Sequence, residues 1–365
     1  MSFIKTPFFR KYFLPGFVFQ SVVIGGGYGT GRELVEYFLR YGPVKGLLGL
    51  VCVTAIMWSV SLAVFFECVR VLKAYDYRSF FSKILGKFWI IFEILYIIAM
   101  LIVLAVVGSA AGVLLRDNFG IPYFGGVTLM FIAIGFHTFK GSEHIEKFLA
   151  AWSFVLYAIY GIIFITAMIK FGPVIIKNFR NSEIHHGWLQ GGFKYAVYNF
   201  QNIPAVMFCL TYIETRKEAC GAGLIAGLIG IFPGLLFFIA VVSQYPAVLQ
   251  SEIPVVFLLD KIGIATLLIV FQIVLFGTLV ETGTGFIHAV NERIQSVYQA
   301  DGKNFPRSLR PVIAIAMLTL STAISSFGII SLIAKGYGAL SWGFFAVFVI
   351  PLFTVGLYKI MNAEK

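Results

Sequence analysis

The chain has 365 residues, of which 59% are hydrophobic and only 12% are charged. A water-soluble domain of this length must cover its surface with polar groups, so this composition excludes one and indicates a protein that lies in lipid. The net charge of +11 does not indicate nucleic-acid binding, because the basic residues stand in short loops between apolar runs and not in one patch.

Apolar runs follow one another along the whole chain, and about ten of them are long enough to cross a bilayer as helices. The first five cover approximately residues 12–40, 44–71, 88–115, 123–139 and 148–169. A polar stretch over 177–190 separates them from the other five, which cover approximately residues 193–214, 219–242, 264–290, 311–327 and 340–360. A loop with a short helix of its own is expected over 244–263. The sequence therefore predicts an all-α transmembrane protein with a single transmembrane domain over residues 1–365.

The distribution of Lys and Arg predicts the orientation in the membrane. If the N-terminus is cytoplasmic, the inner segments hold about twice as many of these residues as the outer segments. An even number of spans then places the C-terminus on the same side. We expect a multi-pass protein of the cell membrane, the inner or plasma membrane, with both termini in the cytoplasm.

The two halves of the chain have similar hydropathy patterns. The first half covers about residues 12–172 and the second about 192–361, and the first span of each half is interrupted by helix-breaking residues. Interrupted spans at corresponding positions of two halves are typical of a transporter binding site. Because each half has an odd number of spans, we expect two inverted five-helix repeats in which the first and sixth helices are broken.

The first break is rich in glycine, which makes up five of the seven residues over 25–31. Each glycine costs up to about 1 kcal/mol relative to alanine in a helix. Unwound backbone at membrane depth is tolerated only where protein, water or a ligand satisfies its polar groups. Free N–H groups suit a carboxylate, and free carbonyl groups suit an ammonium or a metal cation. We expect Gly25, Gly27, Gly29 and Thr30 to bind substrate; the alternative is that the glycines only allow close helix packing.

Two charged residues follow the break, and Glu33 has two interpretations. Thr30 and Glu33 have the spacing of a capping box, in which Glu33 caps the second half-helix. An intramembrane carboxylate is also a candidate proton carrier or partner for a substrate amine. Arg32 is expected to be a structural or gating ion-pair partner.

The sixth span is interrupted by Pro204, which lacks an N–H group and frees a carbonyl group one turn earlier. Asn199, Gln201 and Asn202 place amide groups beside this defect, and Tyr198 precedes them. One interpretation is a kinked helix whose amides are satisfied within the protein. The other, which we adopt as the prediction, is that these four residues form the second wall of the substrate site.

The eighth span carries polar residues at helical spacing. Thr278, Glu281, Thr282, Gly285 and His288 share one face, and such a face must point to the bundle interior or to water. Hydroxyl and carboxylate oxygens suit Na⁺, whereas a carboxylate alone suffices for a proton. We expect Thr278, Glu281 and Thr282 to bind the coupling ion, with Na⁺ favoured. The alternative is interhelical hydrogen bonding, worth about 1 kcal/mol per bond.

Residues 25–38, which read GGGYGTGRELVEYF, resemble the glycine-rich signature of bacterial YkvI-like membrane proteins. Tyr198 and Asn199, residues 278–285 and residues 291–293 also resemble that family. The family lies in the amino acid–polyamine–organocation superfamily. The resemblance covers most of the chain and implies the LeuT-type fold, with ten core helices and the substrate between the first, third, sixth and eighth.

Transporters related to that family carry amino acids, amines or nucleobases, usually with Na⁺ or H⁺. Some proton-coupled relatives have a lysine within the fifth span, but residues 148–168 contain none, which disfavours that proton mechanism. No nucleophile elbow, phosphate-binding loop or zinc motif is present, so we expect no enzymatic activity and no cofactor beyond a coupling ion.

The expected function is secondary active transport of a small polar solute, an amino acid or an amine, coupled to Na⁺ or H⁺ by alternating access. The expected partners are this solute and the lipid bilayer. The alternatives are a non-transporting membrane sensor or scaffold with the same fold, and a nucleobase transporter.

Overall fold

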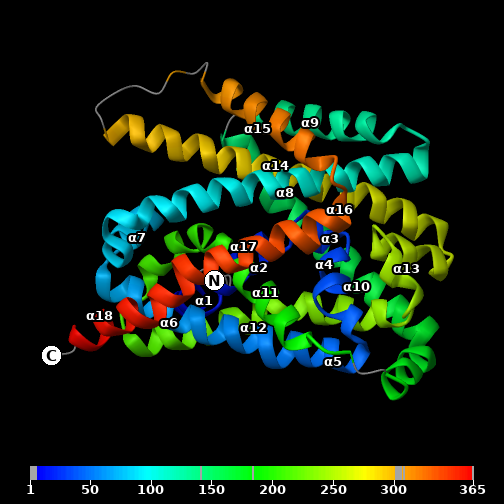
Figure 1. Cartoon of the computed structure of the whole chain (residues 1–365), viewed down its shortest axis with the longest axis horizontal. Coiled ribbons are helices and arrows are strands. Elements are labelled where there is room, and N and C mark those ends of the chain that lie inside the picture. The colour runs from blue at the N-terminus through cyan, green and yellow to red at the C-terminus, as the bar shows by residue number, and fades with distance from the viewer. Residues whose placement is uncertain (1–5, 140–141, 183–184, 301–305, 307–308, 364–365) are drawn as a thin grey trace.

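The computed structural model describes residues 6–139, 142–182, 185–300, 306 and 309–363, and all regular structure in these residues is helical (Figure 1). Most of the long helices run side by side along the longest axis of the molecule. Six described segments are long and apolar enough to cross a bilayer. They are Pro43–Leu72, Tyr77–Phe119, Tyr157–Arg180, Arg216–Val242, Ala265–Gln295 and Ile329–Asn362. This is the pattern of a multi-pass membrane protein, as the composition predicts.

The first half of the chain begins with a broken span. Its pieces are α1 (Pro7–Tyr12), α2 (Leu14–Val23), α3 (Gly26–Gly29) and α4 (Arg32–Tyr37), followed by the 3₁₀ turn η2 (Leu39–Tyr41). The second span is continuous and contains α5 (Pro43–Leu48), the π-helical η3 (Gly49–Ala55) and α6 (Ile56–Leu72). The remaining helices of this half are α7 (Tyr77–Leu85), α8 (Trp89–Phe119), α9 (Tyr123–Phe139) and α10 (Ser142–Arg180).

The second half also begins with a broken span. It consists of α11 (Trp188–Tyr198) and the 3₁₀ helices η5 (Asn199–Ala205) and η6 (Met207–Tyr212). Then follow α12 (Arg216–Val242), η7 (Ala247–Gln250), α13 (Pro254–Ile262), α14 (Ala265–Ala300) and α15 (Leu309–Ser325). The last span runs from α16 (Ile329–Ser331) through the π-helical η8 (Leu332–Tyr337) and α17 (Gly338–Phe344) to α18 (Leu357–Asn362).

Each of the ten predicted spans coincides with one of these helices or broken helices in the described residues. The main differences lie at helix ends. α10 continues to Arg180 and α14 to Ala300, so part of the stretch predicted as polar connection is helical. Hydropathy indicates only the apolar part of a helix, and a polar end can extend the same backbone hydrogen bonds beyond it. The predicted loop with a short helix over 244–263 is confirmed by η7 and α13.

Small residues allow close approach between α12 and α6. A Cβ atom added at Gly223 would lie 2.3 Å from Ala63 Cα, and one added at Gly227 would lie 2.3 Å from Ser59 N. Side chains cannot fit at such positions, so the two backbones pack directly, as is common between membrane helices. This contact joins the second and seventh spans.

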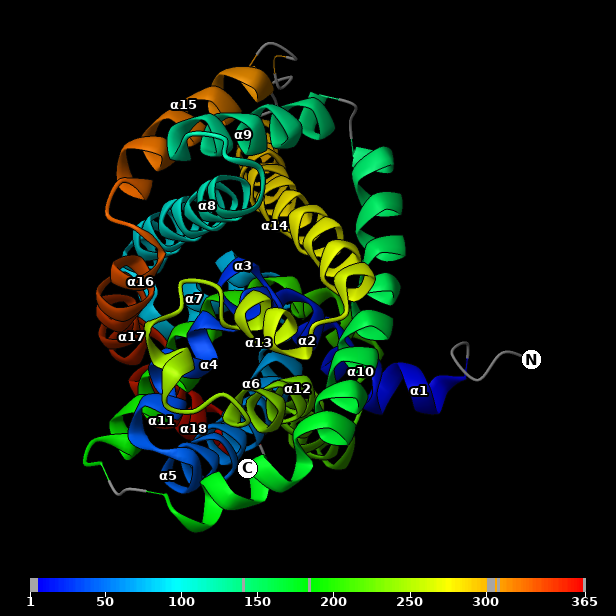
Figure 2. The same cartoon turned by 90° about the vertical axis from the view of Figure 1, so that its right-hand side faces the viewer.

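The broken first span lies in the middle of the molecule. Figure 2 shows α2, α3 and α4 enclosed by α6, α8, α12, α14 and α17. α3 packs against α8 and α14, α2 packs against α12 and η5, and α4 packs against α11. The breaks of the two spans therefore lie side by side in the interior, whereas Phe17 and Phe208 of the same spans are exposed.

Candidate functional site

The first break is a single short turn between two half-helices. α2 ends at Val23, and α4 begins after Gly31, whose φ of +78° is a conformation that glycine adopts readily. The N–H groups of Gly29 and Thr30 donate to the carbonyl oxygens of Gly25 and Gly26 over 2.8 and 3.2 Å. The break is thus less open than the sequence predicts, because part of its backbone is satisfied within the turn.

The Thr30 side chain closes this turn. Its hydroxyl donates to the Gly27 carbonyl oxygen over 2.8 Å and accepts from the Arg32 N–H group over 3.3 Å. The carbonyl oxygens of Gly25, Gly26 and Gly27 therefore each accept one hydrogen bond. Each retains a second lone pair that can accept another donor or a cation.

Glu33 does not cap the second half-helix. The N-cap residue of α4 is Gly31, and no side chain caps it. Instead the Tyr198 hydroxyl donates a hydrogen bond to the Glu33 carboxylate. A Cβ atom added at Gly27 would lie only 2.2 Å from Glu33 Oε1, so the carboxylate lies against the break itself. The contact with Tyr198 joins the two broken spans at a buried point, since Glu33 is 3% exposed.

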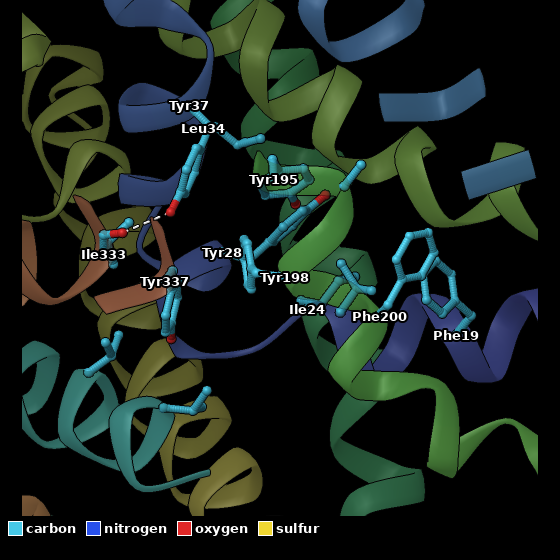
Figure 3. Close-up of a cluster of buried hydrophobic side chains, with 14 of the residues drawn as sticks. Phe19, Ile24, Tyr28, Leu34, Tyr37, Tyr195, Tyr198, Phe200, Ile333 and Tyr337 are labelled. Atoms are coloured by element: carbon cyan, nitrogen blue, oxygen red, sulfur yellow. Dashed lines mark hydrogen bonds between the residues drawn. The ribbon is translucent and has the colours of Figure 1, made fainter. Parts of the chain in front are cut away.

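Five buried tyrosines from three spans surround this point, and Figure 3 shows them converging. We call them the tyrosine cluster: Tyr28, Tyr37, Tyr195, Tyr198 and Tyr337. The Tyr198 ring centroid lies 4.7 Å from that of Tyr337, 5.6 Å from Tyr195 and 5.8 Å from Tyr37. The Tyr37 hydroxyl donates to the Ile333 carbonyl oxygen over 2.8 Å, whereas the buried hydroxyls of Tyr28 and Tyr195 have no hydrogen-bond partner.

The amides of the sixth span are buried just beyond this cluster. Asn199 donates to the Tyr195 carbonyl oxygen over 2.9 Å, and Asn202 donates to Asn199 Oδ1 over 3.3 Å. Gln201 is 4% exposed. These residues lie on η5, which packs against α2. The amides of Asn199 and Asn202 thus bond within their own broken helix, while Tyr198 reaches across to the first span.

The eighth span brings its two threonines to the first break. A Cβ atom added at Gly25 would lie 3.6 Å from Thr282 Cγ2, and one added at Gly29 would lie 3.9 Å from Thr278 Cγ2. The threonine hydroxyls donate to carbonyl oxygens of their own helix four residues earlier, over 2.8 and 2.9 Å. Glu281 is half-buried and lies within electrostatic range of Tyr157 and Tyr160 of α10.

Arg32 binds the loop before α13 and holds it next to the first break. Its guanidinium donates to the carbonyl oxygens of Leu249 and Ser251 over 2.8 and 3.0 Å and pairs with Glu36 at 2.7 Å. The Val255 N–H group donates to the Thr30 carbonyl oxygen over 3.2 Å. We call this set of contacts the loop clamp. Arg32 is thus an ion-pair partner, as the sequence predicts.

A second set of ion pairs lies where α1 meets α12. Lys11 pairs with Glu214 at 2.8 Å and with Glu218 at 2.9 Å. Arg70 at the end of α6 pairs with Glu67 and donates to the Glu214 carbonyl oxygen over 3.4 Å. Ion pairs therefore link the start of the first span to the start of the seventh span.

No family model matches the chain. It is 23% identical over 347 residues to YkvI of Bacillus subtilis (strain 168), described as an uncharacterized membrane protein, and the match covers 90% of this chain and 92% of YkvI. The chain is thus similar to YkvI. The similarity covers most of both chains, in agreement with the resemblance of the glycine-rich stretch.

Solved transporter structures share this fold. MhsT in complex with L-phenylalanine has a TM-score of 0.61 at 15% identity, covering 96% of this chain and 97% of MhsT. A manganese transporter of Eremococcus coleocola has a TM-score of 0.60 at 14% identity, covering 96% and 79%. A Na⁺-coupled sialic acid symporter has a TM-score of 0.53 at 12% identity, covering 95% and 87%. The chain thus has the all-α LeuT-type fold.

Four residues of the tyrosine cluster were missed by the sequence analysis, which singled out only Tyr198. A signal was present, since Tyr28 and Tyr37 flank Glu33 and Tyr195 precedes Tyr198 by one turn. Aromatic residues are common throughout this chain, however, so the pattern stands out only when the spans are assembled. No group of three or more His, Cys, Asp or Glu residues that could hold a metal ion occurs in the described part of the chain.

Proposed function

We propose that the protein is a secondary transporter of the cell membrane, with both termini in the cytoplasm, that carries a small polar solute by alternating access. The solute is an amino acid or an amine. The observation that carries this proposal is the contact between Glu33 and Tyr198, which joins two broken helices in the interior of a LeuT-type fold. Broken helices that meet in the bundle interior supply polar groups for a solute. The transporter names of the three structural neighbours support the same proposal.

The proposed substrate site lies between the first break and the sixth span, at Gly25, Gly27, Gly29, Thr30, Glu33, Tyr198, Asn199, Gln201 and Asn202. Ion coupling is proposed at Thr278, Glu281 and Thr282. The methyl groups of the two threonines lie against Gly29 and Gly25, so a cation that drew the threonine hydroxyls away from their own helix would also lie near the carbonyl groups of the break. This arrangement favours Na⁺, which needs several oxygen ligands at once, over H⁺, which needs a single carboxylate.

A ligand screen followed by a flux measurement tests the proposed function. Purified protein is first screened by thermal shift against amino acids, amines and nucleobases, with and without Na⁺. The compounds that stabilise it are then offered to proteoliposomes that contain the protein. We expect uptake that exceeds the uptake by empty liposomes. A ligand that binds but never crosses would instead favour the sensor or scaffold alternative, and stabilisation by nucleobases alone would favour a nucleobase transporter.

A further inference from the structure

A cavity of about 260 Å³ lies between three spans, apart from the site at the two breaks. Its walls come from α2, α10 and α12. α2 and α10 both pack against α12, and the cavity occupies space between them (Figure 2). None of the residues proposed to bind the substrate or the coupling ion lines this cavity. It is therefore a separate place at which a molecule could bind.

The cavity leads from the surface of the helix bundle to its interior. Phe17 and Phe232 on its walls are 42% and 56% exposed, whereas Ile163, Phe237 and Ala240 on its walls are buried. Phe232 lies within an apolar span, and the outer surface of such a span faces hydrocarbon in a bilayer. A ligand would thus enter the cavity from the membrane and not from water.

A few polar side chains interrupt the apolar walls. Pro233 has no N–H group, so the Ile229 carbonyl group lacks its usual backbone donor, and Gln20 Nε2 donates to it over 2.8 Å instead. Gln20 Oε1 accepts no hydrogen bond from the described residues, and the buried Tyr160 hydroxyl has no partner either. Buried polar groups without partners indicate a place where a ligand or water completes the hydrogen bonding.

The lining of the cavity favours a neutral ligand. No charged side chain of the described residues lines it, and its polar side chains are one amide and two phenols, those of Gln20, Tyr157 and Tyr160. A charged ligand would lose its hydration there without gaining a partner of opposite charge. The size is sufficient for a small apolar molecule, since an apolar cavity of about 150 Å³ holds benzene.

We propose that this cavity binds a neutral, mostly apolar molecule of the bilayer that carries one hydroxyl group, such as an alkyl alcohol. The apolar part fills the space between the three spans. The hydroxyl group, which both donates and accepts, completes the hydrogen bonding of Gln20 or Tyr160. The occupant contacts α2, α10 and α12 at once, so it holds the half-helix before the first break against two continuous spans. The site does not depend on the proposed transport function.

Photolabelling tests the position of the site. The full-length protein in lipid nanodiscs is incubated with octanol that carries a diazirine group, irradiated, digested and analysed by mass spectrometry. We expect saturable label within residues 157–164 of α10 or 232–240 of α12, which excess unlabelled octanol removes. Label that never saturates and is spread evenly over the lipid-facing helices would overturn the proposal.

Matched competitors test the chemistry of the ligand. Octanoate carries a charge in place of the hydroxyl group, and octyl methyl ether lacks the hydroxyl donor. At equal concentrations in the lipid, we expect octanol to compete on the order of tenfold better than octanoate and severalfold better than the ether, since an unpaired charge and a lost hydrogen bond each cost free energy. Equal competition by octanoate or by the ether would contradict a site for a neutral alcohol.

A cavity-filling variant and a matched control complete the test. A Cβ atom added at Gly161, which lines the cavity, meets no atom within 4 Å, so Gly161→Leu keeps the fold while its side chain takes up space there. Gly172 of the same helix also has no atom within 4 Å but does not line the cavity. We expect saturable label to fall by about tenfold in Gly161→Leu, because ligand and side chain compete for one space, and to be unchanged in Gly172→Leu. Equal label in both variants would overturn the proposal, and the label positions in the unaltered protein decide it if Gly161→Leu fails to fold.

Discussion

Gly27 and Glu33 lie in contact across the first break, and this contact depends on the absence of a side chain at position 27. In Gly27→Ala, the new Cβ atom would lie 2.2 Å from Glu33 Oε1 and 3.0 Å from its Cδ and Cγ atoms. The carboxylate must move, and its hydrogen bond from Tyr198 is then lost. We expect affinity for the ligand found by the screen to fall by about tenfold, because the displaced Glu33 side chain no longer faces the bound ligand and a lost hydrogen bond of this kind costs about 1.5–3 kcal/mol.

Isothermal titration of Gly27→Ala measures this loss. The matched control is Gly172→Ala in α10, where an added Cβ atom meets nothing within 4 Å, so its affinity should equal that of the unaltered protein. Equal affinity in both variants would mean that the Glu33 carboxylate is not part of the binding site.

At the residue scale, the sequence identified the chemistry of the site better than its geometry. The glycine run and the polar residues of the sixth span could be identified from the sequence alone. The direction of the Glu33 side chain could not be predicted, because Thr30 and Glu33 also have the spacing of a capping box, in which Glu33 would turn back to the helix start. A true capping box forms elsewhere, between Thr215 and Glu218 at the start of α12. What decides between the two is the position of Tyr198 in space, and no local pattern encodes it.

The loop clamp links two elements that are far apart in the sequence, because the Arg32 side chain of the first span holds the loop before α13. In Arg32→Gln the bonds to Leu249 and Ser251 and the ion pair with Glu36 are lost, while Glu36 keeps its pair with Arg40. We expect the free energy of unfolding to fall by about 1–3 kcal/mol, the usual cost of breaking buried bonds to a charged group. Backbone amide exchange in α13 should become faster.

Hydrogen–deuterium exchange with mass spectrometry checks this expectation, and Arg116→Gln is the control. Arg116 pairs with Glu252 of the same loop, but both side chains are partly exposed, so this pair contributes about 0–1 kcal/mol. Faster exchange of α13 in the control but not in Arg32→Gln would show that the loop is held by other contacts.

Elements were predicted well from sequence where hydropathy determines them. The fourth span, predicted over 123–139, coincides with α9, and both breaks occur where glycine or proline interrupts an apolar run. The extensions of α10 to Arg180 and of α14 to Ala300 were not predicted, because a polar helix end has no hydropathy signal. The packing of α4 against α11 was not predicted from particular residues either, since it arises only when distant segments assemble.

At the scale of the whole molecule, three spans meet at the first break. The sixth span contributes Tyr198, and the eighth contributes Thr278 and Thr282. A bound solute and a bound cation would thus share the same glycine-rich turn. Movement of that turn would change both sites together, which is the requirement for coupled transport by alternating access. The Lys11 pairs at α1 and the loop clamp at α13 restrain the first span at its two ends.

Solute accumulation driven by an ion gradient tests coupled transport most directly. Proteoliposomes are loaded without Na⁺ and diluted into Na⁺ at the same pH, with a compound that the screen identifies as the solute. Coupled transport is expected to give accumulation above the external concentration, which is lost when Na⁺ is equal on both sides and is strongly reduced in Thr282→Ala. Equilibration without accumulation under either a Na⁺ or a pH gradient would contradict it. Accumulation under a pH gradient alone, unchanged in Thr282→Ala, would assign the coupling to protons.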